Sequence, residues 1–217
     1  MSARQDLLTR QLEQGIAALK LSLNPAQYAA LLAYVQLLDK WNQVYNLTAI
    51  RDPSEMITRH LLDSLTVIPF IKGPRVLDVG TGAGLPGIPL AIALPDLQFV
   101  LLDSVAKKTR FVVQAVNELD LKNVTVETRR AEKYLPGELF DTVISRAFSS
   151  LFEFITAAGA HCRHGGVLLA MKGRYPEEEL KALPQGYQLR EVARLVVPGL
   201  DEERHIVCLD RHYSREI

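Results

Sequence analysis

One glycine-rich segment, residues 75–104, constrains the fold of this chain more than any other stretch. The apolar run over 76–79 predicts a strand buried on both faces, and it leads into a turn with glycine at positions 80, 82, 84 and 87. We expect a helix to begin at Pro86, because the fixed φ of proline suits the first helical position. The next buried strand ends at Asp103. This order of elements is typical of a nucleotide-binding unit, in which glycines admit a ligand to the backbone and the acid accepts ribose hydroxyls.

The glycine pattern fits two kinds of ligand. The spacing Gly82-x-Gly84-x-x-Gly87, with Asp103 about 20 residues further on, satisfies the dinucleotide-binding fingerprint. From Asp78 onward, the string Asp-Val-Gly-Thr-Gly-Ala-Gly resembles the first motif of Rossmann-like S-adenosylmethionine methyltransferases. In those enzymes the first acid helps to hold the methionyl end of the methyl donor, and the acid that ends the second strand holds its ribose. The glycines alone do not decide between the two ligands.

Composition limits the remaining possibilities. The chain has 217 residues, of which 48% are hydrophobic, so we expect one globular domain. Its formal net charge is zero, so binding to nucleic acid would have to come from a local cluster of charges. Cys162 and Cys208 form no CxxC motif and suit a reducing compartment. A polar start and the lack of an apolar run of about 18 residues predict a cytoplasmic protein with no membrane span.

The first 70 residues show helical patterns, with capped starts at Asn24 and Asp52. Beyond residue 71, apolar strand patterns alternate with helical ones, including a helix over 150–162 and a strand that follows a turn at Gly165-Gly166. Two final apolar runs predict an antiparallel hairpin. The predicted strands cover 76–79, 99–102, 124–127, 140–145, 167–171, 189–197 and 205–209.

This pattern predicts an α/β fold with two parts. An N-terminal helical segment, residues 1–70, precedes a mostly parallel, doubly wound sheet over 71–217 that ends in antiparallel pairing. Such an end is the arrangement of Rossmann-like methyltransferases. A dehydrogenase would need a second half-sheet or a substrate domain, and too few residues follow Met171 for either. The methyl donor is therefore the favoured ligand.

Ligands of such sheets bind beyond the carboxyl ends of the strands, and basic residues are dense at those positions. Charge runs are most often solvated faces. Several basic residues converging on one rim of a neutral protein are better explained by an anionic substrate. The basic residues at the predicted strand ends are Lys107, Lys108, Arg129, Arg130, Lys133, Arg146, Lys172 and Arg174.

Two acids and one pair of histidines have structural alternatives. Asp103 could cap the following helix, but Ser104 can fill that cap and leave Asp103 for the ribose. Asp78 could be a turn residue, although its place before Gly80 favours a role in the site. The pair His161-x-x-His164 has no nearby acid or cysteine, so we expect a surface pair and no metal site.

Several longer strings are more specific than the glycine turn, above all Gly-Leu-Pro-Gly-Ile-Pro at 84–89. The others include Trp41-Asn42, Tyr45-Asn46-Leu47-Thr48, Arg59-His60-x-x-Asp63-Ser64, Ser145-Arg146-Ala147, Lys172-Gly173 and Glu203-Arg204-His205. On these strings the sequence closely resembles, nearly end to end, the bacterial ribosomal RNA small-subunit methyltransferase G family, also called GidB. The resemblance implies methyl transfer from S-adenosyl-L-methionine to N7 of one guanine in the conserved decoding-region loop of 16S rRNA.

The resemblance and the strand-end pattern together give a set of expected contacts. Residues expected to bind the donor are Asp78, Gly80, Gly82, Gly84, Leu85, Asp103, Ala131, Glu132 and Arg146. Lys133 stands where some family members have a second acid, which leaves Glu132 as the acidic contact of the adenine. The resemblance implies 16S rRNA as the partner, either as free RNA or within the small ribosomal subunit. Residues expected to contact it are Arg59, His60, Lys107, Lys108, Lys172 and Arg204.

Arg146 closes a predicted strand, and we expect its guanidinium to point between the donor methyl and the substrate base. The alternative is a structural ion pair with Asp141 or Glu132. Guanine N7 carries a lone pair, so no proton has to be removed before methyl transfer. We therefore expect catalysis by alignment, with Arg146 as a positioning residue and no general base.

Two other functions remain open at this stage. One is a methyltransferase of the same fold that acts on another substrate. The other is a non-catalytic assembly factor that binds nucleotide or RNA. Both would also need the glycine turn and Asp103, so those features do not separate them from an rRNA methyltransferase.

Overall fold

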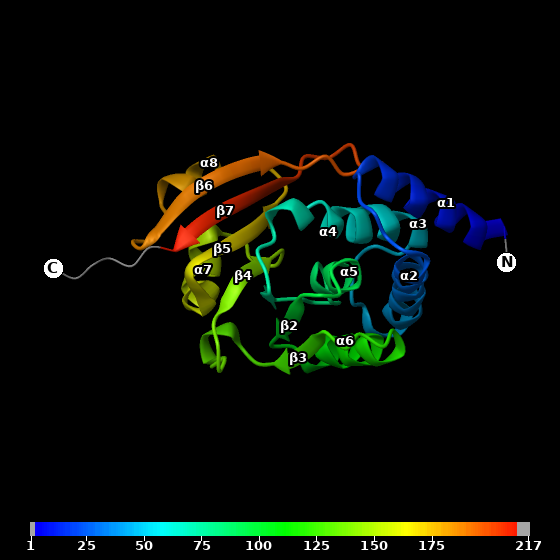
Figure 1. Ribbon diagram of the computed structural model, residues 1–217, viewed down its shortest axis with the longest axis horizontal. Coiled ribbons are helices and arrows are strands. Elements are labelled where there is room, and N and C mark those ends of the chain that lie inside the picture. The colour runs from blue at the N-terminus through cyan, green and yellow to red at the C-terminus, as the bar shows by residue number, and fades with distance from the viewer. Residues whose placement is uncertain (1–2, 212–217) are drawn as a thin grey trace.

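A seven-stranded sheet forms the centre of the computed structural model, which describes residues 3–211 (Figure 1). The strand order is β3-β2-β1-β4-β5-β7-β6, and only β7 runs antiparallel to its neighbours β5 and β6. The α/β class, the mostly parallel sheet and the antiparallel C-terminal hairpin are confirmed. The strands are β1 Arg75–Val79, β2 Gln98–Asp103, β3 Val124–Thr128, β4 Phe140–Ser145, β5 Cys162–Lys172, β6 Tyr187–Arg194 and β7 His205–Arg211.

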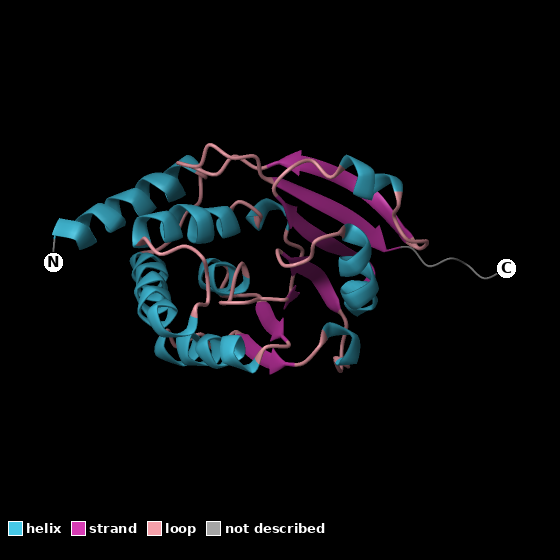
Figure 2. Ribbon diagram, turned by 180° about the vertical axis from the view of Figure 1, so that it is seen from behind, coloured by secondary structure: helices cyan, strands magenta, loops and turns pink. Residues whose placement is uncertain are grey.

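Helices precede and connect these strands. The elements before β1 are all helical: α1 and α2 lie away from the β6–β7 hairpin, whereas the stretch from α3 to α4 runs back toward it (Figure 2). They are α1 Ala3–Ala18, α2 Pro25–Tyr45, α3 Pro53–Met56, the π-helix η1 Ile57–Leu62, α4 Asp63–Leu65 and the 3-10 turn η2 Ile68–Phe70. The later ones are α5 Gly87–Ala93, α6 Ala106–Glu118, the 3-10 turn η3 Ala131–Lys133, α7 Leu151–Ala158, the 3-10 turn η4 Gly159–His161 and α8 Glu177–Lys181.

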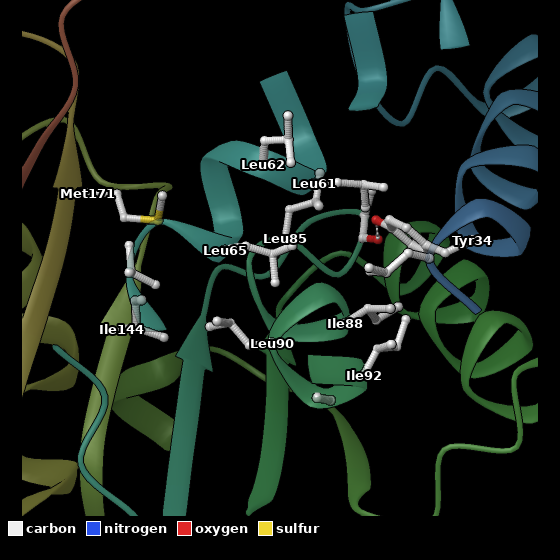
Figure 3. Close-up of a cluster of buried hydrophobic side chains, with 14 of the residues drawn as sticks. Tyr34, Leu61, Leu62, Leu65, Leu85, Ile88, Leu90, Ile92, Ile144 and Met171 are labelled. Atoms are coloured by element: carbon white, nitrogen blue, oxygen red, sulfur yellow. Dashed lines mark hydrogen bonds between the residues drawn. The ribbon is translucent and has the colours of Figure 1, made fainter. Parts of the chain in front are cut away.

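The two faces of the sheet pack against different helices. Successive residues of β4 divide between them: Ile144 belongs to a core shared with α1, α2, α4, α5 and α6, whereas Val143 belongs to a core shared with α7. This alternation follows from the two-residue period of a strand. Figure 3 shows part of the larger core, in which Leu61, Leu62 and Leu65 pack beside Ile88 and Leu90 of α5. The N-terminal helices thus share one apolar core with the face of the sheet that α5 and α6 cover.

Polar contacts fix α2 against the sheet. The capping box predicted at its start is present: Gln27 N donates to Asn24 Oδ1 and Asn24 N donates to Gln27 Oε1. The hydroxyl of buried Tyr34 donates to the carbonyl of Ala83 in the glycine turn, at 2.8 Å (Figure 3). The N-terminal segment therefore supports the turn directly. Trp41 packs on Phe111 of α6.

The two glycines at 165 and 166 lie inside a strand, not in a turn before it. The helix predicted over 150–162 ends at Ala158, and β5 already pairs with β4 at Cys162 before its register shifts. Such a bulge accommodates Gly165 at a φ of +76°. A Cβ on Gly166 would lie 2.7 Å from the carbonyl oxygen of Asp141. The close approach of β4 and β5, which local sequence does not reveal, thus explains why these glycines lie within β5 and not in the predicted turn.

Candidate functional site

Two adjoining cavities lie at the carboxyl ends of β1, β2 and β4, where the sheet topology places ligands. The first, of about 240 Å³, is lined by Asp103 together with Ala131, Glu132 and Phe148. The second, of about 180 Å³, lies over the glycine turn. Gly80 lines both cavities, so together they form one elongated site, which we call the donor cavity.

Asp103 ties the end of β2 to the glycine turn. Its Oδ2 accepts a hydrogen bond from Gly82 N at 2.9 Å, and its Oδ1 accepts one from Val105 N at 2.8 Å. Ser104 does not cap α6, so the expectation that it would is wrong: Val105 stands at the N-cap, and its N–H donates to the carboxylate of Asp103. Each carboxylate oxygen keeps a second lone pair. Asp103 can therefore still accept the two hydroxyls of a ribose.

Glycine is required at two points of the turn by close approach. Gly80 has a φ of +70°, and a Cβ there would lie 2.6 Å from Cβ of Ala147 after β4. A Cβ on Gly87 would lie 2.1 Å from a methyl carbon of Leu101, because the start of α5 packs directly on β2. The helix begins at Gly87, one residue later than predicted, with Pro86 at the capping position.

Asp78 lies under the turn and lines neither part of the donor cavity. Its Oδ2 accepts hydrogen bonds from the Thr81 hydroxyl at 2.6 Å and from Gly87 N at 2.9 Å. Its Oδ1 is buried and has no hydrogen-bond partner among the described residues. Burial raises the pKa of Asp78 to about 7. An acid with one unpaired oxygen beneath the turn fits a ligand that carries positive charge, such as the sulfonium and ammonium of the expected methyl donor.

The other end of the donor cavity is lined by the short turn η3. Ala131 is buried there, and its carbonyl accepts a hydrogen bond from His161 Nε2 at 2.9 Å. His161 is thus a buried support of this wall, and its prediction as a surface residue is wrong, whereas His164 is exposed. Within residues 3–211, no group of three or more His, Cys, Asp or Glu side chains is arranged to hold a metal ion.

A separate cavity of about 390 Å³ lies between η1 and the strands β5 and β7, and we call it the basic cavity. Its charged lining consists of Arg59, Asp63, Arg146, Lys172 and Arg204. Arg146 also lines the donor cavity next to Leu85, so this one side chain separates the two spaces. The volume is in the range of small-molecule sites, which suits one nucleotide.

Asp63 is the centre of the basic cavity. Its side chain is 3% exposed; Oδ2 accepts a hydrogen bond from Arg146 Nη1 at 3.2 Å, and Oδ1 lies 3.4 Å from Nε of Arg204. Burial raises the pKa of Asp63, and the two guanidinium groups oppose that shift. Arg146 also donates to the carbonyl of Arg59 at 3.2 Å. One buried carboxylate thus holds two arginines from distant parts of the chain.

No role was expected for Asp63 from the sequence patterns, although it lies in one of the strings quoted above. Arg146 does form an ion pair, but with neither of the expected partners. Asp141 instead pairs with Arg163 at the amino-terminal end of β4, the end opposite to Arg146. The spacing of Arg59 and Asp63, four residues apart in a helical run, was the one available signal that both face the same space.

His60 is buried and uncharged in this site. Its Nε2 lies 2.9 Å from the hydroxyl of Thr48, and its Nδ1 donates to the carbonyl of Arg59. Burial is the main reason that the pKa of His60 falls to about 4, with the positive charge of Arg146 adding to the effect. His60 can therefore shape the cavity but brings no positive charge to it at neutral pH.

The six residues expected to contact RNA fall into two groups. Arg59, His60, Lys172 and Arg204 line the basic cavity. The ammonium of Lys172 already donates to the carbonyl of Ser149 and to the carboxylate of Glu179. Lys107 and Lys108 lie in the first turn of α6 and do not line this cavity. The expected single basic rim is thus divided into a cavity and a separate surface.

One family and its members match most of the chain in sequence. A family model described as rRNA small subunit methyltransferase G (GidB) matches residues 27–207. Proteins named "Ribosomal RNA small subunit methyltransferase G" from Nitrosococcus oceani and Chromobacterium violaceum are each 53% identical to the chain. The alignments cover 91% and 93% of the chain and 92% and 97% of the relatives.

Solved structures show the same fold at low sequence identity. An S-adenosylmethionine-dependent methyltransferase from Thiobacillus denitrificans, in complex with S-adenosyl-L-homocysteine, aligns with a TM-score of 0.54 at 13% identity. It covers 82% of this chain and 97% of that one. TrmN from Thermus thermophilus aligns with a TM-score of 0.57 at 20% identity, over 78% of this chain and 53% of that one. Within residues 3–211, no helix is both long and apolar enough to cross a membrane.

Proposed function

Since the chain belongs to the rRNA small subunit methyltransferase G family, we propose that it methylates N7 of one guanine in the decoding-region loop of 16S rRNA. The methyl group comes from S-adenosyl-L-methionine. The observation that carries this proposal is the position of Arg146 between the donor cavity and the basic cavity. The reaction would take place in the cytoplasm, with the RNA in the small ribosomal subunit.

The residues of the donor cavity fit this donor. When bound, it supplies an electrophilic methyl group on a positively charged sulfur. Asp103 would accept the ribose hydroxyls, while Ala131 and Glu132 would flank the adenine. The backbone of the glycine turn and Leu85 would hold the methionyl end, above the carboxyl group of Asp78. Gly80 and Gly82 line the donor cavity and would contact the donor, whereas Gly84, the third glycine expected to do so, lines neither part of it.

The basic cavity would hold the target nucleotide. Guanine N7 has an available lone pair and no hydrogen, so the protein does not need to remove a proton before methyl transfer. The task of the chain is then to place N7 in line with the methyl group and to exclude other nucleophiles. Arg146 would contact guanine O6 or a neighbouring phosphate through its fork of N–H donors, in the orientation that Asp63 imposes.

Replacing Arg146 by lysine tests this proposal. R146K keeps the positive charge but loses the fork, so we expect turnover to fall at least about tenfold, or about 1.4 kcal/mol of transition-state stabilisation. R163K is the matched control, because Arg163 also pairs with a buried aspartate but lies beside the amino-terminal end of β4, away from both cavities. Methyl transfer from labelled donor to isolated small subunits is the assay.

Two outcomes would count against the proposal. If R146K works at the wild-type rate, Arg146 is not a positioning residue, and its ion pair with Asp63 is only structural. If the wild-type protein binds the donor but labels no RNA, the chain acts on another substrate or is a non-catalytic assembly factor.

A further inference from the structure

The carboxylate of Glu202 bridges two arginines at the edge of the basic cavity. Its Oε1 accepts from Arg59 Nη2 at 2.7 Å, and its Oε2 accepts from Arg204 Nη2 at 3.0 Å. Glu202 lies in the connection between β6 and β7, which extends across to the N-terminal helices (Figure 1). One acid from the end of the chain thus occupies both arginines, although Arg59 belongs to η1.

Two guanidinium groups on the two oxygens of one anion form a site that also suits a phosphodiester. A phosphodiester presents two anionic oxygens, and arginine binds such groups through charge-assisted hydrogen bonds. Arg59 and Arg204 also line the basic cavity, where a nucleotide bound beside Arg146 would bring its phosphates close to them. Glu202 therefore stands where we expect a phosphate.

The two acids of this network differ in burial, and so in how easily each can be replaced. The side chain of Glu202 is 45% exposed, whereas that of Asp63 is 3% exposed. Exposed ion pairs contribute little to stability, because water and salt compete for both partners. Removing the partner of a buried ion pair is costly, because the other charge is left uncompensated. Glu202 can thus leave while Asp63 still holds Arg204 in position.

Arg59 lies between two cavities whose linings carry opposite charge, and this difference indicates from which side an anion would approach. The basic cavity is lined by four basic side chains and one acid: Arg59, Arg146, Lys172 and Arg204, with Asp63. The smaller cavity on the other side of Arg59 is lined by the acids Glu55, Asp201 and Glu202. An RNA phosphate would therefore approach the two arginines from the basic cavity and replace Glu202 from that side.

We propose that Arg59 and Arg204 form a phosphodiester-binding site for the RNA substrate, which Glu202 occupies in the free protein and yields to RNA. This inference rests on the proposed function, because it requires an RNA substrate. In the free protein, Glu202 keeps the two guanidinium groups together and neutralises one of their charges. On RNA binding, the phosphate replaces the carboxylate.

The test is RNA affinity after removal of the competing charge. E202Q should bind a labelled small-subunit rRNA fragment about two- to fivefold more tightly than wild type in a fluorescence anisotropy titration, since the exposed pair that it removes is weak. E203Q is the matched control: the neighbouring side chain is also an exposed glutamate, and its loss changes the net charge equally. E203Q should bind distinctly more weakly than E202Q. In an R59Q background, E202Q should lose most of its gain.

Each other outcome has a definite meaning. If E202Q binds RNA no better than E203Q, or less well than wild type, Glu202 is a structural support and the inference is overturned while the proposed function stands. If inorganic phosphate competes with RNA at concentrations close to that of the RNA, the site binds small anions and its assignment to RNA is overturned. If neither variant nor wild type binds RNA while donor affinity is intact, the proposed function fails as well.

Discussion

Replacing Asp63 by asparagine should separate positioning from stability. Asparagine keeps the shape of the side chain but removes the charge that holds Arg146 and Arg204. D141N is the matched variant, because Asp141 is equally buried and also holds an arginine, Arg163, at the amino-terminal end of β4. Both substitutions remove one buried negative charge.

The structure sets the expected loss of stability. Removing one partner of a fully buried ion pair costs about 3–5 kcal/mol. Here the arginines keep contact with water: the side chains of Arg146 and Arg204 are 28% and 22% exposed, and that of Arg163 is 55% exposed. Burial also raises the pKa of Asp63, so its charged form is already disfavoured. We therefore expect each variant to lose about 1–3 kcal/mol of the free energy of unfolding.

Turnover should distinguish the two variants. D63N should lower kcat at least about tenfold, because Arg146 loses the contact that aims it between the two cavities, whereas D141N should stay within about twofold of wild type. Donor affinity should be unchanged in D141N, because neither Asp141 nor Arg163 lines the donor cavity, whereas D63N releases Arg146, which does line it, and should lower donor affinity as well. Urea unfolding, calorimetry with the donor and methyl transfer to small subunits give the three quantities. An equal loss of turnover in both variants, at matched folded fractions, would refute the positioning role of Asp63.

Other consequences follow from the same contacts. D103A should weaken donor binding by about 2–4 kcal/mol in calorimetry, because two charge-assisted acceptor sites are lost; an unchanged affinity would remove Asp103 from the donor site. Charge reversal at Lys107 and Lys108 together should weaken RNA binding and flatten its salt dependence, while donor affinity stays the same; an unaltered slope would place the RNA surface elsewhere. Because burial lowers the pKa of His60 to about 4, its contribution to the free energy of unfolding, up to about 3 kcal/mol, should be lost as the pH falls from 6.5 through 4. The H60Q variant should lack that acid-side loss in urea unfolding. Asp78 acts in the opposite direction: its pKa of about 7 makes stability fall as the pH rises from 3.8 to 7, and D78N should remove that slope.

The parts of the fold that sequence predicted are those governed by local rules. The capping box at Asn24, the apolar strand runs and the glycine turn each depend on residues close together in the chain. The need for glycine at position 87 is explained only by the structure, because a larger residue there would clash with Leu101, on which the start of α5 packs.

The parts that sequence missed depend on contacts between distant residues. Arg146 and Asp63 are 83 positions apart, and no local pattern links them. Asp141 was one of two partners considered for a structural ion pair of Arg146, yet β4 separates the two residues and Asp141 pairs with Arg163 at its amino-terminal end. His161 was expected at the surface with His164 because no acid or cysteine lies near the pair; the chain instead enters β5 there, and His161 turns inward toward Ala131.

The most direct test of the central claim is to map methylation of small-subunit rRNA in cells with and without this protein. Nuclease digestion and mass spectrometry of the purified rRNA should show one 7-methylguanosine that disappears without the gene. It should return with the wild-type gene, but not fully with one encoding R146K. If 7-methylguanosine in this rRNA is the same with and without the protein, the chain is not the guanine-N7 methyltransferase that we propose from its donor cavity and basic cavity.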